Sequence, residues 1–210
     1  MRSAPKKARE APFSTKARIL ATAEEVFAAR GFAGASTREI AARGQVNISS
    51  LHYHWDSKET LYFAVFQNIY DRILDLVRRA IPAQLDGRKP GRSVVEETMG
   101  ALFDFFADHP NVPKLLVRRL LENEAAHPDI ERDILVPAWK VFAGWTEEFG
   151  GRKLKEIDSQ LFMLTIHSVV LLFLLDSSHF RNLLGGSVHE PVVRTRVRAY
   201  IIGLVQKLLR

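Results

Sequence analysis

The chain has 210 residues, of which 47% are hydrophobic and 26% are charged. These values are typical of a soluble globular protein with one or two domains and a substantial core. The chain contains no cysteine, which excludes disulfides, thiolate metal sites and cysteine nucleophiles and is compatible with a reducing cytoplasm. Residues 1–60 hold ten Lys/Arg and six Asp/Glu, so +4 of the net charge of +6 lies there. This excess indicates either a polyanion partner or a solvated basic tail.

The N-terminal segment, residues 1–12, contains two prolines and four basic residues without periodicity. This composition predicts a disordered basic arm. No apolar segment follows the basic residues, so the sequence predicts no secretory signal and a cytoplasmic location. A first helix is expected over residues 14–30, where apolar side chains recur at spacings of three, four and seven, and Gly31 is its expected stop.

Residues 36–55 have the pattern of two short helices separated by a tight turn. Ser36 and Glu39 fit a capping box, in which the hydroxyl and the carboxylate satisfy each other's backbone N–H groups. The first short helix must end near Gly44. Asn47 is the expected N-cap of the second short helix.

The second short helix has the features of a helix that reads DNA. Leu51 and Trp55, four residues apart, are expected to anchor it to the two preceding helices. Its remaining side chains are neutral donors and aromatic rings, which suit base edges and phosphates in a major groove. The residues expected to contact DNA are Thr37, Arg38, Ile48, Ser49, Ser50, His52, Tyr53, His54 and Lys58.

These candidate DNA contacts have different expected roles. Residues 48–50 lie in the first turn of the second short helix, where base edges are read, and Arg38 is the best candidate for a bidentate guanine contact. Thr37 and Lys58 lie at helix N-termini, which favour phosphates, and residues 52–54 can donate to phosphates further along.

From residue 58 onward the chain is expected to be entirely helical. A long helix should cover residues 58–81 after capping by Asp56 and Ser57, and residues 82–92 form the clearest linker. Pro137 should kink its helix. Further helices are expected over residues 92–108, 112–126, 128–149, 156–184 and 190–209.

The longest apolar run covers residues 161–175 and has 15 residues. A bilayer span needs about 20 residues, so a buried helix is the better interpretation and no membrane association is expected. A membrane-surface protein would need a basic amphipathic helix, whereas the basic residues here flank the helix-turn-helix positions.

The expected fold is all-α, with an N-terminal three-helix helix-turn-helix DNA-binding domain joined by a long helix to a larger C-terminal helical domain for ligand binding and dimerisation. The expected boundaries are residues 1–12 for the basic arm, 13–62 for the DNA-binding domain with its motif at 36–55, and 63–210 for the C-terminal domain.

The last two expected helices carry apolar faces that are rich for a monomer. These faces include Leu161, Leu164, Ser168, Leu171, Leu172, Leu175, Val193, Val197, Tyr200, Ile201, Leu204 and Leu208. They either complete the monomer core or pair with a second copy of the chain. Reading a palindrome takes two helix-turn-helix units about 34 Å apart, which favours a homodimer through these two helices.

A ligand pocket is expected between the long helix and the four helices that follow it. The candidate lining residues are Tyr70, Phe103, Phe106, Trp139, Phe142, Trp145, His167 and Phe173. Aromatic side chains at helical spacing are more often core than pocket lining, and a single histidine in an apolar run is more often a satisfied core residue. Both interpretations stay open at this point.

Residues 14–64 resemble the DNA-binding domain of the TetR family of bacterial transcriptional regulators. The matching residues are Ile19, Leu20, Ala23, Phe27, Gly31, Phe32, Thr37, Arg38, Ile40, Ala41, Val46, Leu51, Tyr53, His54, Trp55, Lys58 and Leu61. The resemblance implies a two-domain, all-helical homodimer that acts as a repressor and is released from a palindromic operator by a small-molecule effector. The alternative is a constitutive DNA-binding regulator without a ligand.

Three positions depart from the family pattern. Gln45 stands where the family usually has Gly, with Gly44 one residue early, so either another residue takes the positive φ or Gln45 bears strain. His52 takes the place of the usual phosphate-binding Tyr, and an imidazole there would make operator binding depend on pH. Trp55 replaces the usual Phe, which changes packing only.

Catalytic and metal-binding interpretations of the same segment are weak. His52 and His54 are two residues apart and diverge on a helix, whereas zinc-binding histidine pairs are four apart. Ser49 or Ser50 with His52 and Asp56 is too local for a catalytic triad, and no nucleophile elbow is present. We therefore expect no enzymatic activity, no metal and no cofactor. The expected partners are a double-stranded DNA operator, an unidentified small-molecule effector and a second copy of the chain.

Overall fold

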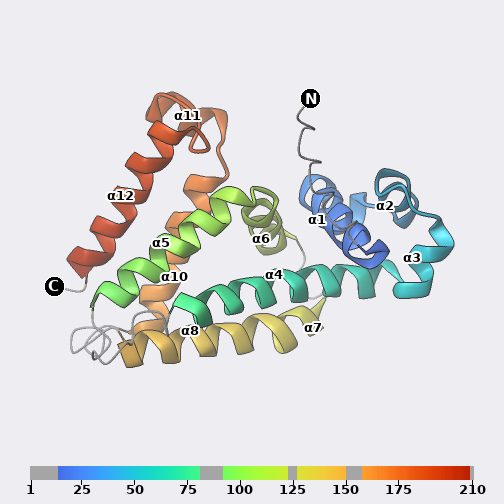
Figure 1. Ribbon diagram of the computed structural model, residues 1–210, viewed down its shortest axis with the longest axis horizontal. Coiled ribbons are helices and arrows are strands. Elements are labelled where there is room, and N and C mark those ends of the chain that lie inside the picture. The colour runs from blue at the N-terminus through green and yellow to red at the C-terminus, as the bar shows by residue number, and fades with distance from the viewer. Residues whose placement is uncertain (1–13, 81–91, 123–126, 150–157, 209–210) are drawn as a thin grey trace, which may run out of the picture.

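The computed structural model describes residues 14–80, 92–122, 127–149 and 158–208. Within these ranges every regular element is a helix. Helices α1 to α3 form a small unit at one end of the molecule, and α4 runs from this unit along the larger helical part (Figure 1). The predicted all-α fold with a helix-turn-helix domain and a larger helical domain is confirmed. The predicted arm over residues 1–12 lies outside the described residues, as does the predicted linker up to residue 91.

Helix α1 (Thr15–Gly34) begins at the N-cap Ser14, whose hydroxyl accepts a hydrogen bond from the N–H of Ala17 at 3.2 Å. The expected stop at Gly31 is a break with φ +71°, after which one further turn continues to Gly34. A Cβ atom at Gly31 would lie 2.1 Å from Oε1 of Glu122. The backbone conformation therefore favours glycine here, and a Cβ atom would also displace the flexible end of the Glu122 side chain.

Helices α2 (Thr37–Arg43) and α3 (Ile48–His54) form the helix-turn-helix. The Ser36 hydroxyl accepts from the Glu39 N–H at 3.1 Å, as expected of an N-cap. The reciprocal half of the predicted capping box is wrong, because the Glu39 carboxylate instead pairs with Arg30 at 2.9 Å and Arg43 at 3.1 Å. Asn47 is the N-cap of α3, as predicted, and its Oδ1 accepts from the Ser49 N–H at 2.9 Å.

The turn between α2 and α3 takes its positive φ at Gln45, whose φ is +51°, while Gly44 remains right-handed with φ −73°. Gln45 therefore bears the strain that glycine avoids at this conformation. Gly44 serves a different purpose, because a Cβ atom there would lie 3.2 Å from Oγ1 of Thr22 on α1. The missing side chain lets the end of α2 approach α1 closely.

Helix α4 (Lys58–Ala80) begins after Ser57, whose hydroxyl accepts from the Thr60 N–H at 3.1 Å. The Thr60 hydroxyl accepts in return from the Ser57 N–H at 3.2 Å. One face of α4 is buried along its whole length, from Leu61 to Val77. The helix is joined to α1 by an ion pair of 3.0 Å between Arg72 and Glu24. Consequently α4 belongs to the packing of both domains.

The remaining helices form the larger domain. They are α5 (Arg92–Asp108), α6 (Asn111–Leu121), α7 (Pro128–Ile130), the π-helix η3 (Glu131–Leu135), α8 (Val136–Phe149), α10 (Ser159–Leu174), α11 (Ser178–Leu184) and α12 (Pro191–Leu208). In this domain α4 packs against α5, α7 and η3. The single helix predicted over residues 128–149 instead contains η3 just before Pro137. The proline lacks the N–H that would continue the α-helical ladder, and the wider π turn accommodates this loss.

The single helix predicted over residues 156–184 is also wrong, since α10 and α11 are bent by 93° at the break between them. Asp176 has φ +50° at this break, and its carboxylate accepts hydrogen bonds from the Ser187 hydroxyl at 2.9 Å and the Val188 N–H at 3.1 Å. Ser177 then caps α11. Within the described residues no single helix is long and apolar enough to cross a membrane, although α10 and α11 together reach that length and composition.

Candidate nucleic-acid interface and ligand cavity

Helix α3 is held to the rest of the N-terminal domain by one face only. Leu51 and Trp55 are buried against α1 and α2, as predicted. The ammonium group of Lys16 on α1 lies 5.9 Å from the centre of the Trp55 ring. The other face of α3 therefore remains open to a partner.

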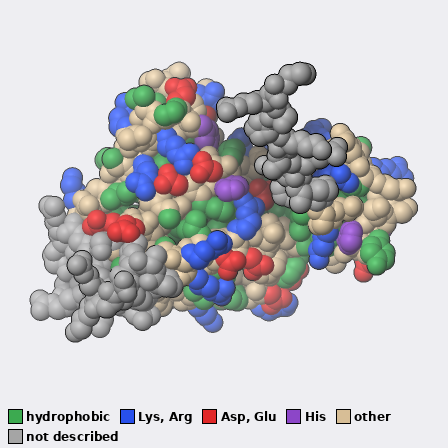
Figure 2. Space-filling model, in the orientation of Figure 1, with side chains coloured by type: hydrophobic (Ala, Val, Ile, Leu, Met, Phe, Trp, Pro, Cys, Tyr) green, Lys and Arg blue, Asp and Glu red, His purple; other side chains and the backbone are tan. Residues whose placement is uncertain are grey.

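The side chains predicted to contact DNA lie together on α2, α3 and the start of α4. Arg38, Ser49, His52, Tyr53 and His54 are exposed, with Tyr53 84% exposed. The other four, which are half-buried, are Thr37, Ile48, Ser50 and Lys58. Figure 2 shows Lys, Arg and His side chains at the surface of this end of the molecule.

The cations around this surface differ in what they already contact. Arg30 and Arg43 share the carboxylate of Glu39. Arg38, one residue before Glu39, has no hydrogen bond or ion pair to another residue in the described part of the chain. An exposed guanidinium without an internal partner is available for a bidentate contact to guanine or phosphate.

Lys58, expected at a phosphate, makes intramolecular contacts that the sequence did not predict. Its Nζ donates hydrogen bonds to the carbonyl oxygens of Phe32 at 2.9 Å and Ala35 at 3.1 Å. It also lies 4.3 Å from the centre of the Phe32 ring. Two of its three donors therefore hold the end of α1 against the start of α4. Only the third is left for a phosphate.

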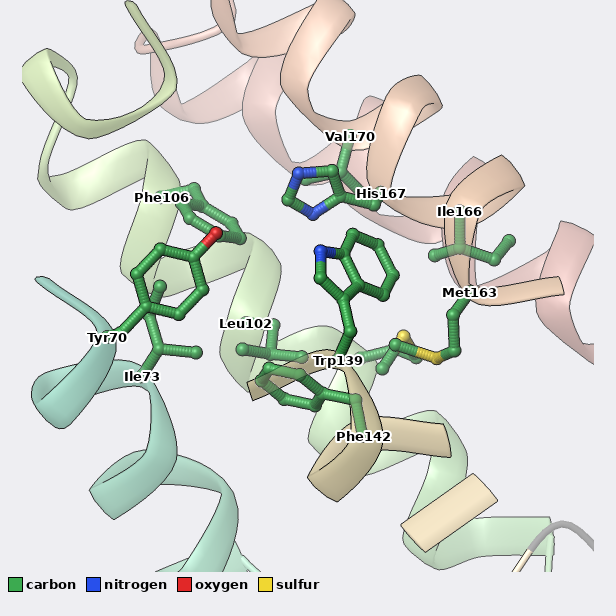
Figure 3. A pocket seen from close by; sticks show the side chains of 11 residues that line it. Tyr70, Ile73, Leu102, Phe106, Trp139, Phe142, Met163, Ile166, His167 and Val170 are labelled. Carbon is green, nitrogen blue, oxygen red and sulfur yellow. The ribbon is translucent and has the colours of Figure 1, made fainter. Parts of the chain in front are cut away.

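A cavity lies between α4, α5, α8 and α10 in the larger domain (Figure 3). Its volume is about 50 Å³. The lining residues are Tyr70, Ile73, Met99, Leu102, Phe106, Trp139, Phe142, Met163, Ile166, His167 and Val170. Five of these were candidates from the sequence: Tyr70, Phe106, Trp139, Phe142 and His167.

Three of the candidate pocket residues do not line this cavity. Phe103 and Trp145 are buried in the core, and the ring of Phe173 lies 6.5 Å from that of Tyr200 on α12. Aromatic residues on one helix face different neighbours, and only tertiary packing decides which of them line a cavity. The aliphatic and methionine lining was missed because such residues look the same in a core and in a cavity wall.

Burial keeps the polar groups of the cavity uncharged at neutral pH. Burial lowers the pKa of the His167 imidazole to about 4, so the ring is neutral near pH 7. Burial raises the pKa of the Tyr70 hydroxyl, which stays protonated. The edge of the Trp139 indole meets the His167 ring with centroids 5.2 Å apart.

The two domains meet where α6 packs against the end of α1. The Arg118 guanidinium on α6 donates to the carbonyl oxygens of Ala28 at 3.3 Å and Ala29 at 3.1 Å. These carbonyls lie just before the break at Gly31, where a helix leaves its last acceptors unpaired. Arg118 thus caps a helix of one domain from a helix of the other.

The last helices bury part of their apolar surface within the monomer and expose the rest. Val193, Val197 and Ile201 of α12 are buried, which fits the completion of the monomer core. The exposed apolar side chains on α10 and α12 include Leu161, Leu164, Leu172, Val192 and Tyr200. The predicted apolar faces are therefore divided between the core and the surface.

This arrangement defines a class of protein: an all-helical, two-domain protein with an N-terminal helix-turn-helix and an internal cavity in the second domain. Residues 19–65 match the family model described as "Bacterial regulatory proteins, tetR family". This N-terminal segment of the chain is therefore similar to the DNA-binding domain of TetR-family regulators.

Two curated relatives are each similar to a part of the chain. The HTH-type transcriptional activator FasR of Mycolicibacterium smegmatis is 39% identical over 90 residues, which cover 43% of this chain and 39% of that protein. The HTH-type transcriptional repressor NicS of Pseudomonas putida is 26% identical over 102 residues, covering 49% of this chain and 46% of that protein. The matched segment therefore spans less than half the length of either relative.

One solved structure resembles nearly the whole fold. The fatty acid degradation regulator FadR from Bacillus halodurans aligns with a TM-score of 0.69 and covers 95% of this chain and 97% of that one. Its sequence identity is 16%, so the likeness concerns the fold alone.

Proposed function

We propose that this chain is a sequence-specific DNA-binding transcriptional regulator. The observation that carries the proposal is the open face of α3. This helix is anchored by Leu51 and Trp55 and carries neutral donors and aromatic rings on its exposed face. Beside it lies Arg38, which is exposed and has no ion pair among the described residues. A helix of this kind fits a major groove, and its N-terminal residues meet the base edges. The match of residues 19–65 to the TetR family supports the same assignment.

In this proposal the predicted contacts divide into base readers and phosphate binders. Residues 48–50 and Arg38 read bases, while Thr37 and residues 52–54 bind phosphates, with Lys58 contributing its remaining donor. The DNA-binding domain is assigned to residues 13–62 and the ligand-binding and dimerisation domain to residues 63–210. Because α4 crosses this boundary without a break, movement of its second half is transmitted to its first turn.

The exposed apolar side chains of α10 and α12 support assembly as a homodimer. Leu161, Leu164 and Leu172 are exposed on one face of α10, with Ser168 between the last two, and offer apolar surface to a second copy. Two copies would present two α3 helices to a palindromic operator. We place this dimer in the cytoplasm, where its DNA would lie.

A small-molecule effector in the cavity would act through α4 and α6. Tyr70 and Ile73 of α4 line the cavity, and Lys58 lies at the other end of the same helix. Arg118 links α6 to the end of α1. A ligand that favours one position of these helices changes the spacing of the two α3 helices, typically with a coupling free energy of about 1–3 kcal/mol.

We propose repression with release by the effector as the regulatory mode, in line with the family resemblance. NicS is named a repressor and FasR an activator, so relatives act in both directions. The second candidate is a constitutive DNA-binding regulator, favoured by the small size of the cavity, about 50 Å³. Effector-dependent loss of operator binding separates the two.

DNA binding is tested by selecting an operator from random duplexes and comparing Arg38→Ala with Arg43→Ala. Both substitutions remove one positive charge from α2, but Arg43 is already paired with Glu39. Arg38→Ala should cost about 1–3 kcal/mol of operator binding and relax sequence preference at one base pair. Arg43→Ala should preserve that preference. If no duplex is selected, or if both variants behave alike, the proposed interface is wrong.

The dimer is tested by sedimentation of Leu164→Glu and Leu120→Glu. Leu164 is 53% exposed on α10, and Leu120 is 61% exposed on α6, outside the proposed interface. A buried charge should separate the subunits in the first variant only. A monomeric wild-type protein, or a dimer that survives Leu164→Glu, would contradict the proposed interface.

A further inference from the structure

Three polar side chains line the cavity between α4, α5, α8 and α10. The hydroxyl of Tyr70, the indole N–H of Trp139 and the ring nitrogens of His167 line it, and none has a hydrogen-bond partner among the described residues. Tyr70 is only 6% exposed. Figure 3 shows the Tyr70 hydroxyl and the nitrogen atoms of Trp139 and His167 turned toward the same space. Trp139 and His167 are half-buried, so the donors and acceptors of the three side chains remain available to a ligand that enters the cavity.

The rest of the wall specifies a ligand without charge. None of the described residues that line the cavity is Asp, Glu, Lys or Arg. The imidazole is neutral near pH 7 because burial disfavours its charged form. A carboxylate or ammonium group would therefore enter without a counter-charge, and burial of an unpaired charge is strongly unfavourable.

The volume of the cavity and the methionine side chains in its wall indicate a small ligand. The volume of about 50 Å³ is below the roughly 150 Å³ of an apolar cavity that binds benzene. Met99 and Met163 are part of the wall, and methionine side chains adapt readily to fill or vacate space. A single ring can enter if these two side chains move, whereas a long acyl chain with a charged head group has neither the room nor the cation that it needs.

We propose that the effector of this protein is an uncharged, single-ring aromatic molecule of the phenol class, whose oxygen binds among Tyr70, Trp139 and His167. A phenol oxygen accepts from the Trp139 N–H or the Tyr70 hydroxyl, and its O–H donates to the unprotonated nitrogen of His167. The ring fills the apolar remainder of the cavity. The term effector rests on the proposed regulatory function; the ligand class rests on the cavity alone.

Three probes of nearly equal size separate the contributions of the ring, the hydroxyl and a charge: 4-ethylphenol, ethylbenzene and 4-ethylbenzoate. Calorimetric titration of the full chain at pH 7.5 should show the tightest binding for the phenol, weaker binding for ethylbenzene and the weakest for the benzoate. The benzoate should bind at least roughly tenfold more weakly than the phenol, because its charge is buried without a partner. Equal or tighter binding of the benzoate, or no binding of the phenol at millimolar concentration, would overturn the proposed ligand class.

A matched pair of tyrosine variants tests the placement of the hydroxyl. Tyr70→Phe removes the cavity hydroxyl, whereas Tyr62→Phe removes another buried, unpaired hydroxyl from the same helix outside the cavity. The first should reduce the preference for the phenol over ethylbenzene by roughly threefold to tenfold. The second should leave this preference unchanged. If both variants or neither alters it, Tyr70 does not bind the ligand oxygen.

A mobility shift with the selected operator distinguishes failure of the ligand class from failure of the proposed function. Phenol binding that leaves operator affinity unchanged would refute the effector role while the ligand class stands. Operator binding by a chain that ignores the phenol would refute the ligand class while the DNA-binding function stands. Phenol-dependent release that Tyr70→Phe weakens and Tyr62→Phe retains is the result expected if both are correct.

Discussion

Lys58 provides a test of whether a basic residue at the start of a helix binds phosphate or holds the domain together. Its Nζ donates to the carbonyls of Phe32 and Ala35 and lies over the Phe32 ring. Lys58→Met keeps the apolar stem and removes the ammonium group. Hydrogen bonds to charged groups each contribute about 1.5–3 kcal/mol, and partial exposure reduces this value, so we expect a loss of about 2 kcal/mol in the free energy of unfolding.

Urea unfolding followed by circular dichroism measures this loss. With an m-value of about 2 kcal/mol/M, the midpoint should fall by about 1 M. Arg38→Met is the matched control, because it removes a cation from an exposed side chain that has no ion pair among the described residues. Its free energy of unfolding should change by less than about 0.5 kcal/mol. If Lys58→Met unfolds at the wild-type midpoint and loses only DNA binding, the structural role argued for Lys58 is wrong.

Three further predictions concern stability. Gln45→Gly should stabilise the fold by about 0.5 kcal/mol, because relief of the strain at the φ of +51° exceeds the entropy that glycine adds to the unfolded chain. Gly44→Ala should destabilise the fold, because the new Cβ would lie 3.2 Å from Oγ1 of Thr22. Thermal unfolding of the two variants checks that their effects have opposite signs. The folded-state pKa of His167, about 4, lies below its ordinary value, so stability is full above pH 6.5 and should fall by about 3 kcal/mol as the pH drops toward 4. His167→Gln should abolish this part of the pH dependence, and an unchanged profile would exclude His167 as its source. Gly31→Ala should lower the free energy of unfolding by about 1–2 kcal/mol, because φ is +71° and the new Cβ would displace the end of the Glu122 side chain. A variant with wild-type stability would contradict the observed break.

The short helices of the N-terminal domain were predictable because their signals are local. Ser36 and Asn47 cap helices at the residues that the sequence indicated, and Leu51 and Trp55 are buried as their spacing required. A cap depends on a few neighbouring residues, and a helical face depends on a spacing of three or four. Of the two partners of Glu39, Arg43 lies four residues later on the same helix, whereas Arg30 reaches it from another helix and was not predictable in this way.

Long apolar segments were less informative about where helices end. The break at Asp176 follows from hydrogen bonds to Ser187 and Val188, eleven and twelve residues later. The apolar run before it continues helical periodicity without a stop signal. The five cavity residues found from the sequence were recognisable as aromatic or imidazole side chains on α4, α5, α8 and α10, but nothing in their spacing separated them from Phe103 and Trp145 in the core.

The amino-acid sequence by itself determined the all-helical class, the helix-turn-helix with its caps, and the resemblance of this segment to TetR-type DNA-binding domains, because each depends on residue types at short, fixed separations. Tertiary structure decided what those residues contact. The Lys58 ammonium donates to two carbonyls at the end of α1, Arg38 has no ion pair within the described part of the chain, and Tyr70, Trp139 and His167 come from three helices to line one cavity. Such contacts join residues far apart in the chain, and they arise only when whole helices pack against one another.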